Sequence, residues 1–367
     1  MAPSIAETLP IHSLAKERKD EPSSYPEPLK LSGALNHFAF EETTPVIGRE
    51  FLHVNIVDDL LRASNSDELV RDLAITISQR GVVFFRAQDN LTDDLQKELV
   101  QRLGQLAGKP ASSTLHIHPV LNNTSEFGVA DAEISTISSL ARKKMFQHDR
   151  QSDRRRYDSA QWHSDIQFEP APADYTSLRL TQLPSSGGDT LWASGYEIYD
   201  RFSRRYQQFL EGLTATFSGD GFIKAAERDP VNVRIYTEPR GSPLNVGDGL
   251  ITVHPVVRTN PVTGWKSIYA LGTFPKYINE LNSEESEELL KKFHSLLINN
   301  HDLQVRFKWR NKNDIAIWDN RSVFHSATFD YEGLGERFGH RTVGIGEKPY
   351  LDPNSKSRTE ALAELHE

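Results

Sequence analysis

Short apolar runs separated by turn signals dominate the chain from about residue 175 onwards. The segments Tyr175–Leu183 and 305–309 alternate apolar and polar side chains, as strands of a sheet do. Two further apolar runs lie at 315–318 and 323–325, on either side of a short turn, and residues 254–270 read as a hairpin. These patterns predict a β-sandwich or barrel with helices on its outside.

Apolar stripes at helical spacing predict four helices around these strands. Three of them begin with capping-box pairs, and the first is followed by an apolar run, Val82–Phe85, that predicts a strand. The helices are expected over about 65–81, 95–108, 194–209 and 282–297.

The 367 residues allow one large domain or two small ones. Residues 1–45 are rich in proline and charge, and we expect them to form a flexible N-terminal arm. A single domain is expected over 46–355, followed by a C-terminal tail over 356–367.

No run approaches the ~20 apolar residues of a membrane span, and the first residues do not resemble a secretory signal. We therefore expect a cytoplasmic protein with no membrane partner.

The composition excludes several kinds of site. The chain contains no cysteine, which excludes a disulfide framework, a thiolate zinc site, an iron–sulfur cluster and a cysteine nucleophile. Any metal must therefore be held by His, Asp or Glu. The formal net charge of −9 argues against a nucleic-acid partner.

A polar segment, 130–161, carries two basic clusters, Arg142–Lys144 and Arg154–Arg156. They could form a patch that binds an anion or a nucleic acid, or belong to a solvated loop, such as a lid beside a site. The negative net charge and the absence of interleaved aromatic residues favour the loop. We interpret the segment as a basic loop insertion.

The most informative histidine lies in the sequence His163-Ser164-Asp165. Residues i and i+2 of a strand point to the same side, so this imidazole and carboxylate can reach a common point. A second histidine would complete the two-His-one-carboxylate triad of non-haem Fe(II) oxygenases. The motif alone also fits an ordinary surface strand. The candidates for the third ligand are His254, His301, His325 and His340.

His325 is favoured because it ends a predicted strand and is followed by Arg337 and Arg341. A guanidinium binds a carboxylate as a bidentate fork, so a metal beside these arginines suits an acidic substrate. His254 has no such neighbours and is interpreted as structural. His340, adjacent to Arg341, is interpreted as shaping the pocket.

Two other motifs carry weaker signals. His116-Ile117-His118 could be a separate metal site, but no third ligand follows nearby, so a pocket wall or ordinary strand histidines are favoured. The segment Gly187–Thr190 predicts a tight turn and lacks the lysine of a phosphate-binding loop.

Over about residues 45–355 the chain resembles the taurine/2,4-dichlorophenoxyacetate dioxygenase (TauD/TfdA) family of Fe(II)- and 2-oxoglutarate-dependent oxygenases. It is closest in appearance to the fungal alkylsulfonate and taurine dioxygenases. The segments that carry the resemblance occur in the family's order. They are 81–86, 115–120, 162–165, 187–192, 254–259, 318–321 and 340–341.

This resemblance implies an α+β, mainly β fold: a double-stranded β-helix, or jelly roll, with flanking helices. It places His163, Asp165 and His325 on the family's iron ligands. Thr190 and Arg337 fall on the pair that binds the distal carboxylate of 2-oxoglutarate. The implied cofactor is Fe(II), with 2-oxoglutarate and O2 as cosubstrates.

The resemblance also implies a substrate site. Arg341 falls on the arginine that binds the sulfonate in the taurine enzyme, His118 on a substrate-contacting histidine, and Phe168 on a pocket aromatic. Leu121 replaces a substrate-contacting tyrosine, and Ser159 stands near the position of an asparagine. Both changes remove polar groups, so we expect a substrate with a more apolar tail than taurine.

The activity implied is hydroxylation of the carbon next to a sulfonate, which releases sulfite and an aldehyde, with succinate and CO2 as coproducts. One alternative keeps this chemistry on an aryloxyacetate, a sulfate ester, a purine or a secondary metabolite. Another is a non-redox metal isomerase or hydrolase on a jelly roll. The partner expected is a small anionic substrate, with no nucleic acid; a homo-oligomer is left open.

Overall fold

The computed structural model describes residues 25–120, 129–140, 161–230 and 233–364 of the chain. Within these ranges, no helix combines the length and apolar character that a membrane span requires.

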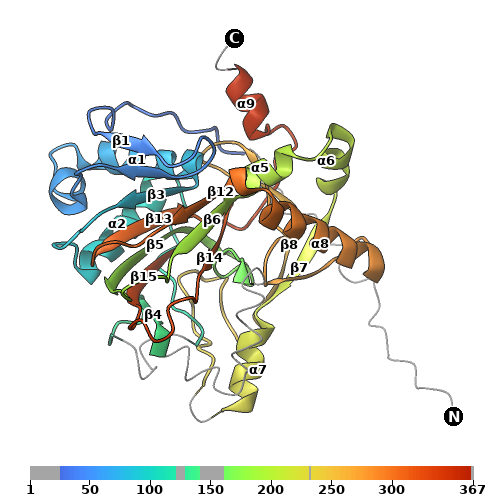
Figure 1. Cartoon of the computed structure of the whole chain (residues 1–367). Helices are drawn as coiled ribbons and strands as arrows, with labels where there is room; N and C mark the ends of the chain where they lie inside the picture. The colour runs from blue at the N-terminus through green and yellow to red at the C-terminus, as the bar shows by residue number, and fades with distance from the viewer. Residues whose placement is uncertain (1–24, 121–128, 141–160, 231–232, 365–367) are drawn as a thin grey trace.

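A seven-stranded sheet forms the centre of the molecule (Figure 1). Neighbouring strands are antiparallel except β2 and β3, which run parallel. Its order is β1 (Phe40–Glu42), β2 (Arg49–Phe51), β3 (Val82–Phe85), β13 (Asp314–Asp319), β5 (Ala173–Gln182), β15 (Phe338–Ile345) and β4 (Ser135–Ser138).

Three smaller sheets complete the β-structure. They are β12 (Gln304–Phe307), β6 (Thr190–Ser194) and β14 (Val323–Ala327); β11 (Pro275–Ile278), β7 (Thr214–Ser218) and β8 (Ile251–Pro255); and the pair β9 (Val257–Thr259) and β10 (Lys266–Ile268). The first of these packs on the central sheet through Trp192, which lies edge-on to both Phe84 and Trp318. Burying such large rings supplies much of the energy that holds the two sheets together.

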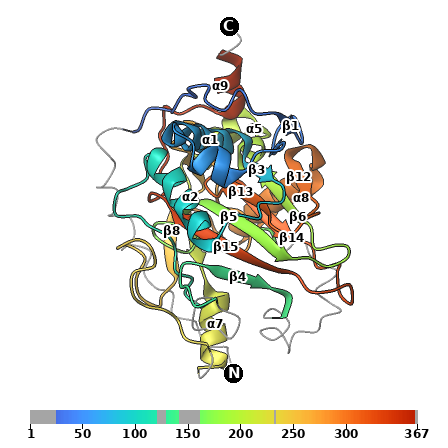
Figure 2. The same ribbon diagram turned by 90° about the vertical axis from the view of Figure 1, so that its left-hand side faces the viewer.

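Helices cover the opposite face of the central sheet. Helices α1 (Ser66–Arg80) and α2 (Asp93–Leu106) lie in front of it in Figure 2. Leu69, Leu73 and Ile77 of α1 are fully buried in the cluster that joins these helices to the sheet, each stabilising the fold by about 1.5–3 kcal/mol. The remaining elements are η2 (Ile56–Leu61), α5 (Gly195–Asp200), α6 (Arg204–Leu210), α7 (Asp220–Arg228), α8 (Ser283–Asn299), η4 (His301–Leu303) and α9 (Arg358–Glu364).

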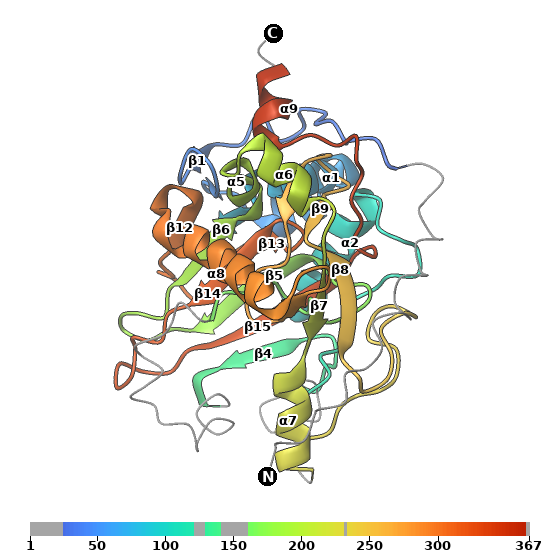
Figure 3. The same ribbon diagram turned by 90° about the vertical axis from the view of Figure 1, so that its right-hand side faces the viewer.

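The structure confirms three of the four expected helices, as α1, α2 and α8, and α8 has the capping box of Asn282 and Glu285. The expected helix over 194–209 is wrong, because it is broken into α5 and α6, which Figure 3 shows near α8. Ser203 between them has extended backbone angles. Tyr206 and Phe209 of α6 are exposed, so the apolar stripe does not continue as one buried face.

Part of the expected flexible arm, residues 1–45, is packed on the domain. The backbone N–H groups of Ser32, Gly33 and Ala34 donate to the buried carboxylate of Asp72, and β1 pairs with β2. The domain therefore begins before residue 46, the start expected from the sequence. Leu35 is also buried in the core cluster, with Leu29 and Phe38 packed against it. The segment is therefore held both by apolar contacts and by hydrogen bonds to a buried charge. Residues 1–24 lie outside the described residues.

The expected loop 130–161 also contains regular structure. Ser135–Ser138 forms the edge strand β4, and Ile134 just before it is buried. The two basic clusters of this segment lie outside the described residues. The tail over 356–367 contains α9, whose Arg358 pairs with Glu197 of α5.

Candidate active site

The structure brings His163, Asp165 and His325 together. Their ligand atoms all lie within 4.8 Å of one another, and no other metal-binding group of this kind occurs among the described residues. His163 pairs with His325 of β14 through two backbone hydrogen bonds of 3.1 and 2.8 Å, so their rings lie 4.3 Å apart. This backbone bridge fixes the distance between the two imidazoles.

The turn after β13 holds the segment that carries Asp165. Asn320 in this turn accepts hydrogen bonds from the Ser164 hydroxyl at its carbonyl oxygen (2.7 Å) and from the Asp165 N–H at its side chain (3.0 Å). Its amide group donates to Thr176 of β5, and Trp318 donates to its Oδ1. Asn320 therefore ties the short metal motif to the central sheet. In the sequence, Asn320 lies in one of the segments that carry the family resemblance, but no role is predicted for it there.

Gly272 packs closely against the backbone of Trp162 and His163. Gly272 has a φ of +102°, and a Cβ there would lie 2.6 Å from the Trp162 carbonyl oxygen and 2.9 Å from the His163 Cα. Only glycine fits this close backbone approach without strain.

The protonation states fit a metal site. Burial acts to raise the pKa of Asp165, but the positive charge of Arg341 and the two imidazoles outweigh it and lower the pKa to about 2. Burial lowers the pKa of His325 to about 3 and also lowers that of His163. The Nδ1 of His163 lies 2.7 Å from the carbonyl oxygen of Gln161, an acceptor, so Nδ1 carries the proton and Nε2 is free to bind a metal. Two neutral imidazoles and one carboxylate are the donor set of an open non-haem iron site.

Thr190 and Arg337 lie together beside this group. Arg337 donates to the Thr190 hydroxyl (3.2 Å) and to the Gly188 carbonyl oxygen (2.9 Å). Burial lowers the pKa of Arg337 to about 10, and no described carboxylate lies within ion-pair distance of it. Thr190 pairs with Ala327, two residues beyond His325, so it is a diagonal neighbour of that imidazole. A buried cation without an anionic partner calls for an anionic ligand.

Arg341 faces the metal group from β15. Its Nη1 donates to Oδ1 of Asp165 at 2.7 Å, and this oxygen also faces Nε2 of His163 and of His325, at 4.0 and 3.9 Å. His118 is buried nearby, and its Nδ1 accepts a hydrogen bond from the Val120 N–H. Burial, together with the charge of Arg341, holds the pKa of His118 well below its usual range. The neutral ring therefore carries its proton on Nε2.

Aromatic rings close this region. Phe168 is fully buried, and its ring lies 5.6 Å from that of Phe222 and 5.1 Å from that of Phe274. Phe222 also lies edge-on to His118 (4.9 Å), and Phe274 edge-on to His163 (6.2 Å). Phe222 and Phe274 were missed in the sequence, where isolated aromatic residues carry no positional signal. Leu121, the fourth expected substrate residue, lies outside the described residues, as does Ser159.

The remaining histidines lie away from the metal group. His254 is structural, as expected, since its Nε2 lies 3.1 and 3.0 Å from the carbonyl oxygens of Gln167 and Glu169. His116 is buried beside Glu169, in keeping with an ordinary buried histidine. The interpretation of His340 as shaping the pocket is wrong. It pairs with Asp93 of α2 at 2.6 Å, on the face of β15 opposite to Arg341.

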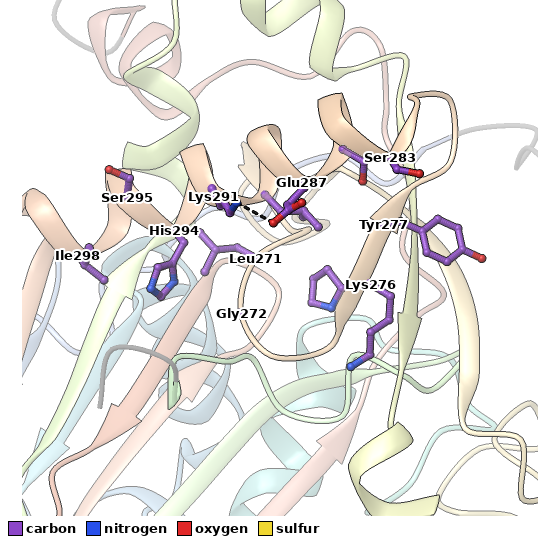
Figure 4. A pocket seen from close by; sticks show the side chains of 13 residues that line it. Leu271, Gly272, Lys276, Tyr277, Ser283, Glu287, Lys291, His294, Ser295 and Ile298 are labelled. Carbon is purple, nitrogen blue, oxygen red and sulfur yellow. Dashed lines mark ion pairs between the residues drawn. The ribbon is translucent and has the colours of Figure 1, made fainter. Parts of the chain in front are cut away.

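A hollow of about 620 Å³ lies next to the metal group but does not contain it. Figure 4 shows it between α8, with Lys291 and His294, and the segment that includes Leu271 and Tyr277. Gly272, which backs onto His163, lies on its wall. The hollow and the metal motif therefore share Gly272 as a neighbour.

A His-Asp-His group with Asp165 and His325 buried and His163 half-buried, beside an arginine without a carboxylate partner among the described residues, is typical of the class of Fe(II)- and 2-oxoglutarate-dependent oxygenases. The family model for taurine catabolism dioxygenase TauD, TfdA family, matches residues 39–343, and the chain belongs to this family.

Known proteins agree with this assignment. The chain is 51% identical over 344 residues to the alpha-ketoglutarate-dependent dioxygenase btcD of Neocamarosporium betae, which covers 91% of this chain and 98% of the relative. It is 32% identical over 312 residues to the alpha-ketoglutarate-dependent sulfonate dioxygenase of Saccharomyces cerevisiae, covering 85% and 68%. The crystal structure of a taurine dioxygenase from Burkholderia xenovorans superposes with a TM-score of 0.61 at 24% identity, covering 87% of this chain and 94% of that one.

The protein is therefore a 2-oxoglutarate-dependent dioxygenase that uses Fe(II), 2-oxoglutarate and O2 and acts on a small-molecule substrate. Family membership rules out the alternative of a non-redox isomerase or hydrolase.

Proposed function

We propose that this enzyme hydroxylates the carbon next to a sulfonate group. The reaction consumes one O2 and one 2-oxoglutarate for each sulfonate, and yields an aldehyde, sulfite, succinate and CO2. The observation that carries the proposal is the position of Arg341, whose guanidinium contacts Asp165 of the metal-binding group at 2.7 Å. A sulfonate bound by this guanidinium would bring its adjacent carbon close to the metal-binding group.

In this proposal, His163, Asp165 and His325 hold the iron, and Thr190 and Arg337 bind the distal carboxylate of 2-oxoglutarate. When bound, iron would activate O2, the oxidant, with 2-oxoglutarate supplying two electrons as it is converted to succinate and CO2, chemistry that side chains cannot perform. The unpaired charge of buried Arg337 supports its role, since a carboxylate ligand would neutralise it.

The chain's own residues orient the substrate. Arg341 would form charge-assisted hydrogen bonds to the sulfonate, and Nε2–H of His118 would donate one more. Phe168, Phe222 and Phe274 would contact the substrate's apolar tail and exclude water.

We also assign the central sheet and the β12–β6–β14 sheet to the two walls of a double-stranded β-helix, within a single domain on which α9 also packs. The packing of Trp192 between Phe84 and Trp318 and the likeness to a solved taurine dioxygenase support this assignment. We further propose a cytoplasmic enzyme with no nucleic-acid or membrane partner.

A second candidate, the same chemistry on a non-sulfonate substrate, is favoured by one observation. The relative at 51% identity has a name that includes no sulfonate, whereas the relative named as a sulfonate dioxygenase is 32% identical. Such a substrate would be an aryloxyacetate, a sulfate ester, a purine or a secondary metabolite.

A substrate panel distinguishes the two candidates. Purified enzyme with Fe(II), 2-oxoglutarate and O2 is given alkylsulfonates, including hexanesulfonate and taurine, and members of each alternative class. Succinate and sulfite are both quantified. Equal amounts of succinate and sulfite with a sulfonate support the main proposal. Succinate with only a non-sulfonate substrate supports the second candidate and refutes the first.

A further inference from the structure

Three buried side chains meet where β6 and β12 run side by side. The indole N–H of Trp309, just beyond β12, donates to the hydroxyl oxygen of Thr190 at 3.1 Å. Arg337 donates to the same oxygen through Nη2 at 3.2 Å. All three residues are nearly inaccessible to water. The position of Trp309 was noted in the sequence only as part of an alternating strand.

These two hydrogen bonds determine the direction of the Thr190 hydroxyl proton. A threonine hydroxyl has one proton to donate and two lone pairs that accept. Trp309 and Arg337 occupy both lone pairs, and no described residue accepts a hydrogen bond from this hydroxyl. The proton must therefore point away from both donors, toward a group that the protein does not supply.

Arg337 presents a second unused donor at the same place. Its Nε and Nη2 have acceptors at Gly188 and Thr190, and its Nη1 has none among the described residues. The guanidinium also lies 6.0 Å from the centre of a ring of Trp309, at the outer limit of a cation–π contact. The Thr190 hydroxyl and Nη1 of Arg337 can therefore both donate to one carboxylate, which the positive charge of the guanidinium would also attract.

We propose that Trp309 is a positioning residue for the distal carboxylate of 2-oxoglutarate. Its indole N–H fixes the Thr190 hydroxyl as a donor to that carboxylate, and its ring supports the Arg337 guanidinium. This inference rests on the proposed function in one respect, the assignment of Thr190 and Arg337 to 2-oxoglutarate.

The test is Trp309→Phe, which keeps an aromatic ring and removes the N–H. The matched control is Trp192→Phe, because Trp192 is also buried and its Nε1 has no hydrogen-bond partner among the described residues. Affinity for the unreactive analogue N-oxalylglycine is measured by calorimetry on the Fe(II)-loaded protein without O2. The melting temperature and the KM values for 2-oxoglutarate and for the substrate are measured in parallel.

We expect Trp309→Phe to weaken analogue binding by about fivefold to tenfold, the usual effect of one lost hydrogen bond. The KM for 2-oxoglutarate should rise by a similar factor, while the KM for the substrate stays unchanged. Trp192→Phe should lower the melting temperature, because it leaves a gap in the core, but should bind the analogue as the wild type does. In a Thr190→Val background, Trp309→Phe should have no further effect, because the hydroxyl it positions is absent. Equal binding by the two tryptophan variants, or full additivity with Thr190→Val, overturns the inference.

Arg337→Gln separates this failure from failure of the proposed site. If Arg337→Gln binds the analogue normally, the assignment of 2-oxoglutarate to this site is wrong, and the inference fails with it. If Arg337→Gln loses binding while Trp309→Phe keeps it, only the role of Trp309 is refuted.

Discussion

The guanidinium of Arg341 and the carboxylate of Asp165 form a buried ion pair of 2.7 Å within the His-Asp-His group. This pair links the residue expected to bind the substrate to a residue expected to bind the metal. One positive charge therefore stabilises the ionised carboxylate and remains within reach of an anionic substrate.

Loss of the carboxylate should abolish metal binding. Asp165→Ala leaves two neutral imidazoles and an unpaired arginine, so we expect no measurable Fe(II) binding by calorimetry and no succinate. Asp302→Ala, at an exposed aspartate far from the site in sequence, serves as the control. Retained Fe(II) affinity in the Asp165 variant would show that these residues are not the metal ligands.

Replacement of the arginine should affect the substrate selectively. For Arg341→Ala, we expect the KM for hexanesulfonate to rise by about one to two orders of magnitude, since a charge-assisted hydrogen bond is worth roughly 1.5–3 kcal/mol. The KM for 2-oxoglutarate should change much less. Steady-state assays of succinate measure both. An unchanged KM for the sulfonate in a folded variant contradicts the proposed role of Arg341.

The close approach at Gly272 predicts a local effect on the metal site. Gly272→Ala should displace the backbone of His163 and weaken Fe(II) binding, because its Cβ would lie 2.9 Å from the His163 Cα. The control is Gly333→Ala, where φ is also positive (+79°) but a Cβ would contact nothing within 4 Å. Both variants carry backbone strain of about 1 kcal/mol. Calorimetry should show lower Fe(II) affinity only for Gly272→Ala, and equal affinities would exclude the steric explanation.

A second buried ion pair, Asp319 with Arg321, predicts the response of the fold to acid. Burial acts to raise the pKa of Asp319, but the charge of Arg321 and hydrogen bonds from Ser78 and Asn260 outweigh it and lower the pKa below its ordinary value of 3.8. A pKa depressed by folding contributes stability that is fully present well above pH 3.8 and is lost as the pH falls through the folded-state value.

Asp319→Asn should therefore lower the free energy of unfolding at pH 7 by about 3–5 kcal/mol, because Arg321 stays buried without its partner. The difference from the wild type should shrink as the pH approaches 3. Urea unfolding at a series of pH values measures both. A difference that does not depend on pH would refute the role assigned to this carboxylate.

Much of the fold follows from local sequence patterns. The stripes of α1, α2 and α8 and the runs of β3, β13 and β14 lie where the sequence predicts them. Tyr175–Leu183 shows the limit of such patterns, since β5 is buried on both faces rather than one. One face of β5 packs on α2, and Leu178 and Leu180 pack in a cluster with Val305 and Phe307 of β12. Both α2 and β12 are far from β5 in sequence, so periodicity cannot reveal them.

For the site, the spacing of His163 and Asp165 and the position of His325 before two arginines predicted the three ligands. The strand expected at His163 is reduced to a single bridge with His325. The roles of Asn320, Gly272 and Trp309 were not predicted, because each depends on a contact with a segment far away in sequence. Arg341 was expected to face the substrate, and its contact with Asp165 could be seen only in three dimensions.

His340 and Arg341, adjacent in β15, point to opposite faces of the central sheet. A shift of β15 by a single position would exchange them, with the imidazole at the metal group and the guanidinium against α2. The connection between β14 and β15 can therefore vary in length among related enzymes only if β15 pairs so that Arg341 still faces the metal group. Selection on activity would then act on the alternation of this strand as strongly as on the chemical identity of its arginine.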